Sequence, residues 1–317
     1  MLCNLILIMA AMNSILNLSK TIKIPITKQL INFRTFKFPA GENHIILQDQ
    51  ITTDKVTIVS SMRNSDDIMT VLLATDAVKR SKFDVKINLV IPYFPYSRQD
   101  RVINKGEPLS AKVMANLINS CKYEKVMVFD NHSDVSSCLL NNAHIINNHK
   151  FVIKAIDNLI GSTKLSPDGL YEVANDICIV SPDAGAQKKI YEVCKYLGFV
   201  QNKNIIFGSK NRDVRTGEII STDFIGDVNG KLCFIIDDII DGGTTFTRLG
   251  EILKERGALK IYLIASHGIF SKGTNIFKTS IDGIYTTDSI TSNEYLNDET
   301  GYVRIMNLMN CTKELFN

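Results

Sequence analysis

The stretch of residues 235–245 brings carboxylates, glycines and hydroxyls together in an order that could bind a phosphorylated sugar. Its polar and turn residues are Asp237, Asp238, Asp241, Gly242, Gly243, Thr244 and Thr245. An apolar strand over 232–236 would deliver the first two carboxylates, and exposed N–H groups at the start of a helix over 245–256 would suit a phosphate. Because carboxylates repel phosphate, they should bind sugar hydroxyls, a hydrated Mg²⁺ or both. An acidic helix cap would explain one of these aspartates but not three.

Three further polar clusters follow apolar strands. They are residues 98–101 (Arg98, Gln99, Asp100 and Arg101), 130–132 (Asp130, Asn131 and His132) and 181–183 (Ser181, Pro182 and Asp183). In open α/β sheets, ligands bind outside the carboxyl ends of the strands. We therefore expect these clusters to lie at the ligand-binding edges of the sheets.

Apolar strands alternate with amphipathic helices along most of the chain. The sequence predicts strands over 56–60, 87–91, 126–129, 177–180, 232–236 and 261–265, and helices over 65–80, 111–121 and 245–256, with another ending near 197. This alternation predicts an α/β fold with mainly parallel sheets flanked by helices. The polar stretch 205–227, which contains Lys210 and Arg212, departs from the pattern and predicts a β-excursion with a mobile tip.

A length of 317 residues allows two domains of ordinary size. The stretch 161–175 is the best linker or surface loop near the midpoint. We expect an N-terminal domain over 1–150, a C-terminal domain over 151–299 that carries the 235–245 loop, and a tail over 300–317 that returns to the first domain.

Composition excludes several classes of protein. With 45% hydrophobic and 22% charged residues the chain is neither disordered nor fibrous, and a net charge of +3 is too small to indicate nucleic-acid binding. The seven cysteines are far apart, which indicates neither a zinc ribbon nor a disulfide framework but a reduced, cytoplasmic protein. The apolar run 5–12 is too short to span a membrane and no basic residue precedes Lys20, so we expect a first buried strand rather than an anchor or signal peptide.

The 235–245 stretch resembles the phosphoribosyl-diphosphate binding loop of the type I phosphoribosyltransferase superfamily. Five motifs, which occur in family order between about residues 38 and 271, resemble the signatures of ribose-phosphate pyrophosphokinases. They are residues 91–101, 107–112, 130–132, 181–185 and 266–271. The resemblance implies two phosphoribosyltransferase-type α/β domains and a Mg²⁺-dependent enzyme that moves the diphosphoryl group of ATP to the C1 hydroxyl of ribose 5-phosphate.

The resemblance also implies roles for individual residues. Residues matching ATP-binding positions are Arg98, Gln99 and Asp100, together with Phe38 and Glu42, which would reach the ATP of a neighbouring subunit. His132 and Asp183 match positions near Mg²⁺, and Lys210, Arg212 and His132 match catalytic positions. Residues matching the ribose 5-phosphate site are Asp237, Asp238, Asp241, Gly242, Gly243, Thr244 and Thr245. The family shares ATP sites between subunits, so the resemblance implies a homo-oligomer based on dimers, up to a hexamer, with no role for nucleic acid or membrane.

The chain departs from the family pattern at several positions. Ala40 replaces an aspartate, Gly242 a threonine, Thr244 a glycine, Asn131 a leucine and Asn211 an arginine. Two other functions stay open. A phosphoribosyltransferase would use the same phosphate loop without needing the 98–101 or 181–183 motifs, and a non-catalytic regulatory subunit would bind nucleotides without turnover. Phe38 could equally be a core residue.

Overall fold

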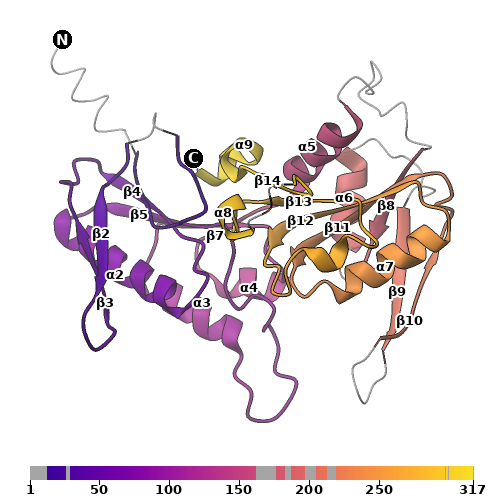
Figure 1. Cartoon of the computed structure of the whole chain (residues 1–317). Coiled ribbons are helices and arrows are strands. Elements are labelled where there is room, and N and C mark those ends of the chain that lie inside the picture. Colours follow the sequence, from indigo (N-terminus) through magenta and orange to yellow (C-terminus); the bar gives the residue numbers. More distant parts are fainter. Residues whose placement is uncertain are drawn as a thin grey trace. The chain divides into compact units, whose positions relative to one another are not determined.

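The computed structural model describes residues 13–25, 29–161, 176–182, 187–196, 205–212, 219–296, 298 and 300–316. The chain forms two compact units (Figure 1). The first unit ends at Asn147 and also includes the segment that begins at Thr312, whereas the second runs from Asn148 to Cys311. The first limit lies near the expected boundary at 150. The second unit runs past the expected limit at 299, because β14 (Val303–Met306) pairs with β13 (Gly283–Thr287) within it.

The first unit is built on a five-stranded parallel sheet with the strand order β1-β4-β5-β6-β7. Its strands are β1 (Asn13–Asn17), β4 (Lys55–Val59), β5 (Lys86–Ile91), β6 (Lys125–Phe129) and β7 (Ala143–Ile146). Its helices are α2 (Ser65–Ser81), α3 (Ser110–Ser120), α4 (Asp134–Leu139) and the short η5 (Lys313–Phe316), which contacts β6. A separate antiparallel hairpin, β2 (Phe33–Lys37) and β3 (Asn43–Leu47), lies beside α2 (Figure 1).

Every second residue of the central strands in this sheet faces one apolar core. Val56 of β4 and Leu89 of β5 are fully buried there, together with Val71 and Val78 of α2. Burying each such side chain contributes about 1.5–3 kcal/mol. Strands of a parallel sheet are covered on both faces and therefore form continuous apolar runs, which is why these strands were predictable from the sequence.

The second unit holds a seven-stranded sheet in the order β10-β9-β8-β11-β12-β13-β14. Besides β13 and β14, its strands are β8 (Ile177–Ser181), β9 (Ile205–Arg212), β10 (Ile219–Ile225), β11 (Leu232–Ile240) and β12 (Lys260–Gly268). Its helices are α5 (His149–Ile160), α6 (Gln187–Tyr196), α7 (Thr244–Glu255), α8 (Asn293–Leu296), α9 (Leu308–Cys311) and the short η4 (Asn275–Phe277). All neighbouring strands are parallel except β9 and β10, which are antiparallel.

The α/β fold class, with mainly parallel sheets and flanking helices, is confirmed. The β-excursion is confirmed as the β9–β10 pair, whereas its tip, 213–218, lies outside the described residues. The expected first strand is present as β1, and the expected loop 161–175 lies outside the described residues except for Gly161. The hairpin β2–β3 and helix α5 were not predicted from the sequence. None of the described helices combines the length and apolarity needed to cross a bilayer.

Candidate active site

The carboxylates expected to hold a sugar lie within the last four residues of strand β11. Asp238 is only 7% exposed and Asp237 is partly exposed, although both follow the buried residues Ile235 and Ile236. The N–H of Asp238 donates to Oδ1 of Asp237 over 2.8 Å, which orients the Asp237 carboxylate at the carboxyl end of the strand. This is the edge at which ligands of parallel sheets bind.

The turn between β11 and α7 requires glycine. Gly243 precedes the first residue of α7 and adopts a left-handed φ of 78°. A Cβ atom at this position would lie 2.5 Å from the ring of Phe277 and 2.7 Å from Cδ1 of Ile276. No side chain caps the helix, so the first N–H groups of α7 remain available for a ligand. An uncapped N-terminus of a 12-residue helix suits a phosphate.

A second loop holds this turn in place. The N–H groups of Ile269 and Phe270, just after β12, donate to the carbonyl oxygen of Ile240 over 2.7 and 3.3 Å. Phe270 is 5% exposed and its ring packs edge-on against the ring of Phe277, with centroids 6.1 Å apart. The loop after β12 therefore lies against the turn between β11 and α7, residues 241–243.

The 266–268 part of the fifth motif is buried and structural. His267 is 2% exposed, and its Nδ1 lies 2.8 Å from the hydroxyl of Ser289. The carbonyl oxygen of Ser266 accepts hydrogen bonds from Thr287 Oγ1 (2.7 Å) and Ser289 Oγ (3.1 Å). This network fixes the carboxyl end of β12 and of β13, from which the loop leaves.

In the first unit, the structure brings the 98–101 and 130–133 segments together. The hydroxyl of Ser133 donates to Oδ2 of Asp100 over 2.6 Å, and Nε of Arg101 lies 3.0 Å from Oδ1. The Arg101 guanidinium, with help from Ser133, holds the pKa of Asp100 below its usual value. Arg98 and Gln99 are exposed, as a nucleotide-binding role requires. The contact between the two segments is made by Ser133, which lies one residue beyond the 130–132 cluster.

Of the residues that follow β6, Asp130 and Asn131 are buried and His132 is exposed. Asp130 is 1% exposed and has a left-handed φ of 41°, which is unusual for a residue other than glycine. Nδ2 of Asn131 donates to the Ser133 carbonyl oxygen (2.9 Å) and to Ser137 Oγ (2.8 Å). His132, which follows these two buried residues, is exposed. Strained residues of this kind concentrate at functional sites.

The hairpin tip presents aromatic rings to solvent. Phe38 is 47% exposed, with ring centroids 5.2 Å from Phe36 and 5.5 Å from His44. The tip is closed by a hydrogen bond of 2.9 Å from the Phe38 N–H to the carbonyl oxygen of Glu42. Phe38 is therefore not a core residue, and Glu42 beside it is exposed. The alternative of a buried Phe38 was wrong because the hairpin extends beyond the sheet.

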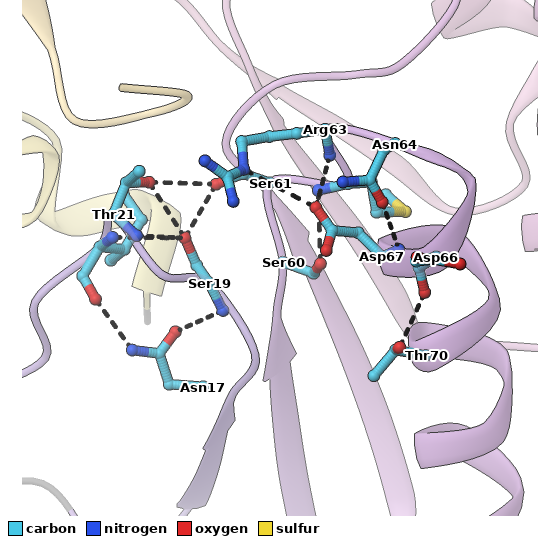
Figure 2. A network of polar contacts seen from close by, with 12 residues as sticks. Asn17, Ser19, Thr21, Ser60, Ser61, Arg63, Asn64, Asp66, Asp67 and Thr70 are labelled. Carbon is cyan, nitrogen blue, oxygen red and sulfur yellow. Dashed lines mark hydrogen bonds and ion pairs between the residues drawn. The ribbon is translucent and has the colours of Figure 1, made fainter. Parts of the chain in front are cut away.

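Figure 2 shows a network that the sequence did not reveal, at the carboxyl end of β4. The hydroxyl of Ser61 lies 2.9 Å from Ser19 Oγ and 3.4 Å from Thr21 Oγ1. Helix α2 is capped by Asn64, whose Oδ1 accepts from the N–H of Asp67 over 2.9 Å. Serine and threonine are common in loops of every kind, so their spacing carried no signal.

The remaining expected residues are only partly described. Lys210 and Arg212 lie on β9, where Lys210 pairs in register with Thr222 of β10. Asp183 lies outside the described residues. Within the described part of the chain, no three His, Cys, Asp or Glu side chains gather into a cluster able to hold a metal ion.

Comparisons with known proteins agree with this geometry. Residues 7–121 match the model of the N-terminal domain of ribose phosphate pyrophosphokinase, and residues 215–300 match the phosphoribosyl synthetase-associated domain. Ribose-phosphate pyrophosphokinase of Vibrio cholerae serotype O1 is 31% identical over 80% of this chain and 77% of its own length. The enzyme of the same name from Buchnera aphidicola subsp. Schizaphis graminum is 31% identical over 88% of this chain and 84% of its own length.

A solved structure supports the fold. Phosphoribosylpyrophosphate synthetase from Mycobacterium smegmatis superposes with a TM-score of 0.72 at 21% identity, covering 96% of this chain and 98% of its own. The identity of the sequence relatives over most of both chains, together with the fold, shows that this chain belongs to the ribose-phosphate pyrophosphokinase family of enzymes.

Proposed function

We propose that this protein transfers the diphosphoryl group of ATP to the C1 hydroxyl of ribose 5-phosphate, producing phosphoribosyl diphosphate and AMP. The observation that carries the proposal is the end of β11, where Asp237 and Asp238 precede the glycine turn and the uncapped start of α7. Carboxylates suit the sugar hydroxyls, and helix N–H groups suit the 5-phosphate. Family membership specifies the reaction that this site performs.

The second unit binds the acceptor in this proposal. Asp237 and Asp238 accept hydrogen bonds from ribose hydroxyls, and Asp241 lies at the mouth of the turn. The phosphate is held by residues of the turn and the first residues of α7, namely Gly242, Gly243, Thr244 and Thr245. Thr244 is exposed and Thr245 is partly exposed, so both hydroxyls can reach a ligand. Holding the sugar at both ends fixes its C1 hydroxyl for attack.

The first unit binds the nucleotide in this proposal. The exposed Arg98 and Gln99 contact ATP, because a guanidinium suits phosphate oxygens. Asp100 is already bonded to Arg101 and Ser133, so it positions the segment and keeps its charge. Phe38 and Glu42 at the hairpin tip reach the adenine of a neighbouring subunit's ATP, which accounts for an exposed phenylalanine there.

Magnesium fits the available donors. The described residues offer separate carboxylates and the exposed His132 rather than a closed cage, and Mg²⁺ is usually held by one or two carboxylates together with substrate phosphates and water. In the proposal His132 and Asp183 lie near the ion, which when bound neutralises charge on the ATP phosphates. Lys210 and Arg212 stabilise the negative charge of the transferring group and exclude water.

The proposal also covers assembly and location. A hairpin that completes the nucleotide site of a neighbour requires a homo-oligomer, based on dimers and extending up to a hexamer. We place the enzyme in the cytoplasm, with ATP and ribose 5-phosphate as its substrates.

The decisive experiment is AMP formation by the purified protein with ATP and Mg²⁺, with and without ribose 5-phosphate. We expect AMP only with the sugar phosphate, in a 1:1 ratio with phosphoribosyl diphosphate. Consumption of phosphoribosyl diphosphate with a nucleobase would instead indicate a phosphoribosyltransferase. Nucleotide binding without AMP would indicate a regulatory subunit.

The Lys210→Ala, Arg212→Ala double variant tests the catalytic assignment. We expect kcat to fall by about 10³-fold or more, by analogy with other cations that stabilise phosphoryl transfer. Circular dichroism and the melting shift caused by ATP check that the variant still folds and binds nucleotide. Turnover equal to that of the wild type would overturn the catalytic roles of Lys210 and Arg212.

A further inference from the structure

Lys272 lies beside the phosphate turn, although no motif identified it. A Cβ atom built on Gly242 would lie 3.7 Å from Cε and 3.9 Å from Cδ of Lys272. The ammonium nitrogen is one bond beyond Cε, so it lies close to the face of the turn that Gly242 leaves open. Since glycine has no side chain, this face is occupied by the Lys272 side chain and by Oγ of Ser271, which would lie 3.9 Å from the same Cβ atom.

Backbone hydrogen bonds on both sides of Lys272 hold it in position. Two residues earlier, Phe270 is buried and its N–H donates to the Ile240 carbonyl oxygen at the end of β11. One residue later, the N–H of Gly273 closes a turn by donating to the Phe270 carbonyl oxygen over 2.8 Å. Lys272 is thus the exposed residue at the top of a turn anchored on both sides.

The charge around the turn requires a cation if a phosphate is to bind. Asp237, Asp238 and Asp241 are all anionic, and a sugar phosphate brings further negative charge. Within the segments 237–245 and 268–274, Lys272 is the only Lys or Arg in the sequence. Among the described residues, no hydrogen bond or ion pair commits its ammonium group to another partner.

We propose that Lys272 binds the phosphate of the sugar-phosphate substrate, supplying the positive charge that the Gly242–Thr245 turn itself lacks. This inference rests on the proposed function, because it names a further binding residue for the same ribose 5-phosphate site. Lys272 selects for the phosphorylated over the unphosphorylated sugar, and it takes no part in transferring the diphosphoryl group.

The test compares Lys272→Met with Lys272→Arg and with Lys278→Met. Lys278 is a matched control because it lies six residues along the same segment with its Nζ 5.5 Å from the centroid of the Tyr302 ring. At saturating ATP, Lys272→Met should raise KM for ribose 5-phosphate about ten-fold to a hundred-fold, the loss of one charge-assisted hydrogen bond. The KM for ATP should not change, and Lys272→Arg should restore most of the affinity.

A second measurement does not depend on turnover. Ribose 5-phosphate without ATP should raise the melting temperature of the wild type and of Lys278→Met, and should raise that of Lys272→Met much less. Ribose without the phosphate should act equally weakly on all of them.

The outcomes separate this inference from the proposed function. An active wild type whose Lys272→Met variant keeps the KM and the melting shift of Lys278→Met would overturn the role of Lys272 alone. A wild type that makes no AMP but shows the lysine-dependent melting shift would overturn the reaction and keep the phosphate site. A wild type with neither activity nor shift would overturn both.

Discussion

Helices α4 and α7 begin in similar surroundings but differ at their first turn. Each follows a central strand of its sheet that ends in an aspartate-containing loop. At α4 the cap is Ser133, whose Oγ accepts from the N–H of Val135 over 3.1 Å and donates to Asp100. At α7 the cap is Gly243, which offers no side chain.

At α4 a side chain accepts a hydrogen bond from an N–H group of the first turn, whereas at α7 no side chain does so. In the first unit, α2 is closed in the same manner as α4, by the Asn64 side chain (Figure 2). The start of α7 has no such side-chain cap, which is the arrangement that the proposed phosphate site requires. Helices α3 and α5 also begin without a side-chain cap, so what sets α7 apart is the combination of an uncapped start, the glycine turn and the neighbouring aspartates.

Gly243→Ala should have the largest effect on this contrast. The new Cβ would lie 2.5 Å from the Phe277 ring at a left-handed φ of 78°. We expect a loss of about 3 kcal/mol in the free energy of unfolding from strain and overpacking, with most activity lost. Urea unfolding measures the first and AMP formation the second.

Gly230→Ala is the matched control for that variant. Gly230 lies in the same unit at a φ of 71°, and a Cβ there would have no atom within 4 Å. Gly230→Ala should lower the free energy of unfolding by about 1 kcal/mol, because only the left-handed backbone is unfavourable for alanine. Equal losses at both positions would mean that the contact with Phe277 is unimportant.

Ser133→Ala should lower stability, whereas Thr244→Ala should weaken substrate binding without lowering stability. Ser133→Ala removes a cap and a hydrogen bond to Asp100, so it should lower the free energy of unfolding by about 1 kcal/mol. Thr244→Ala removes an exposed hydroxyl and should leave stability unchanged while raising KM for ribose 5-phosphate. Urea unfolding and steady-state kinetics on both variants check this, and a destabilised Thr244→Ala variant would contradict the comparison.

Acid titration tests the closed arrangement around Asp100. Arg101 and Ser133 hold the pKa of this carboxyl below its ordinary value of 3.8, so its ionised form stabilises the fold. That contribution is complete above the ordinary value and is lost as the pH falls through the lowered pKa. Asp100→Asn should therefore show a weaker loss of stability below pH 3.8, measured by thermal unfolding, and Ser133→Ala a smaller change of the same sign. An unchanged acid profile in Asp100→Asn would show that the pair contributes nothing.

Thiol labelling tests the exposure of α4 and should show the smallest effect, because it compares labelling rates and requires no change in the stability of the fold. Cys138 on α4 is exposed, whereas burial raises the pKa of Cys311 to about 11 and that of Cys194 to about 12. At pH 8 a disulfide reagent should label Cys138 quickly and these two buried thiols slowly. Mass spectrometry identifies the labelled peptides, and Cys138→Ser should remove the fast site at that position. Fast labelling of Cys311 would show that the second unit opens near α9.

Much of the architecture and several site residues were predictable because their signals are local. Buried parallel strands form continuous apolar runs, and Asp237 to Thr245 join one such run to a helix start. The hairpin β2–β3 was missed because β2 is largely exposed and lacks an apolar run, and the apolar run of β3 is only three residues long. Phe36 and Phe38 contact each other and His44. Helix α5 was missed although it carries a buried face with Phe151 and Val152.

The sequence alone determined the fold class, the family resemblance and the position of the acidic glycine turn before α7, because each depends on residues adjacent along the chain. Only the tertiary structure showed that Ser133 joins Asp100, that Phe277 forbids a side chain at Gly243, and that Lys272 lies beside Gly242. These contacts join residues about 30 positions apart. No local pattern specifies them, because the pairing of β11 with β12 and the packing of the loops that follow the strands bring such residues together.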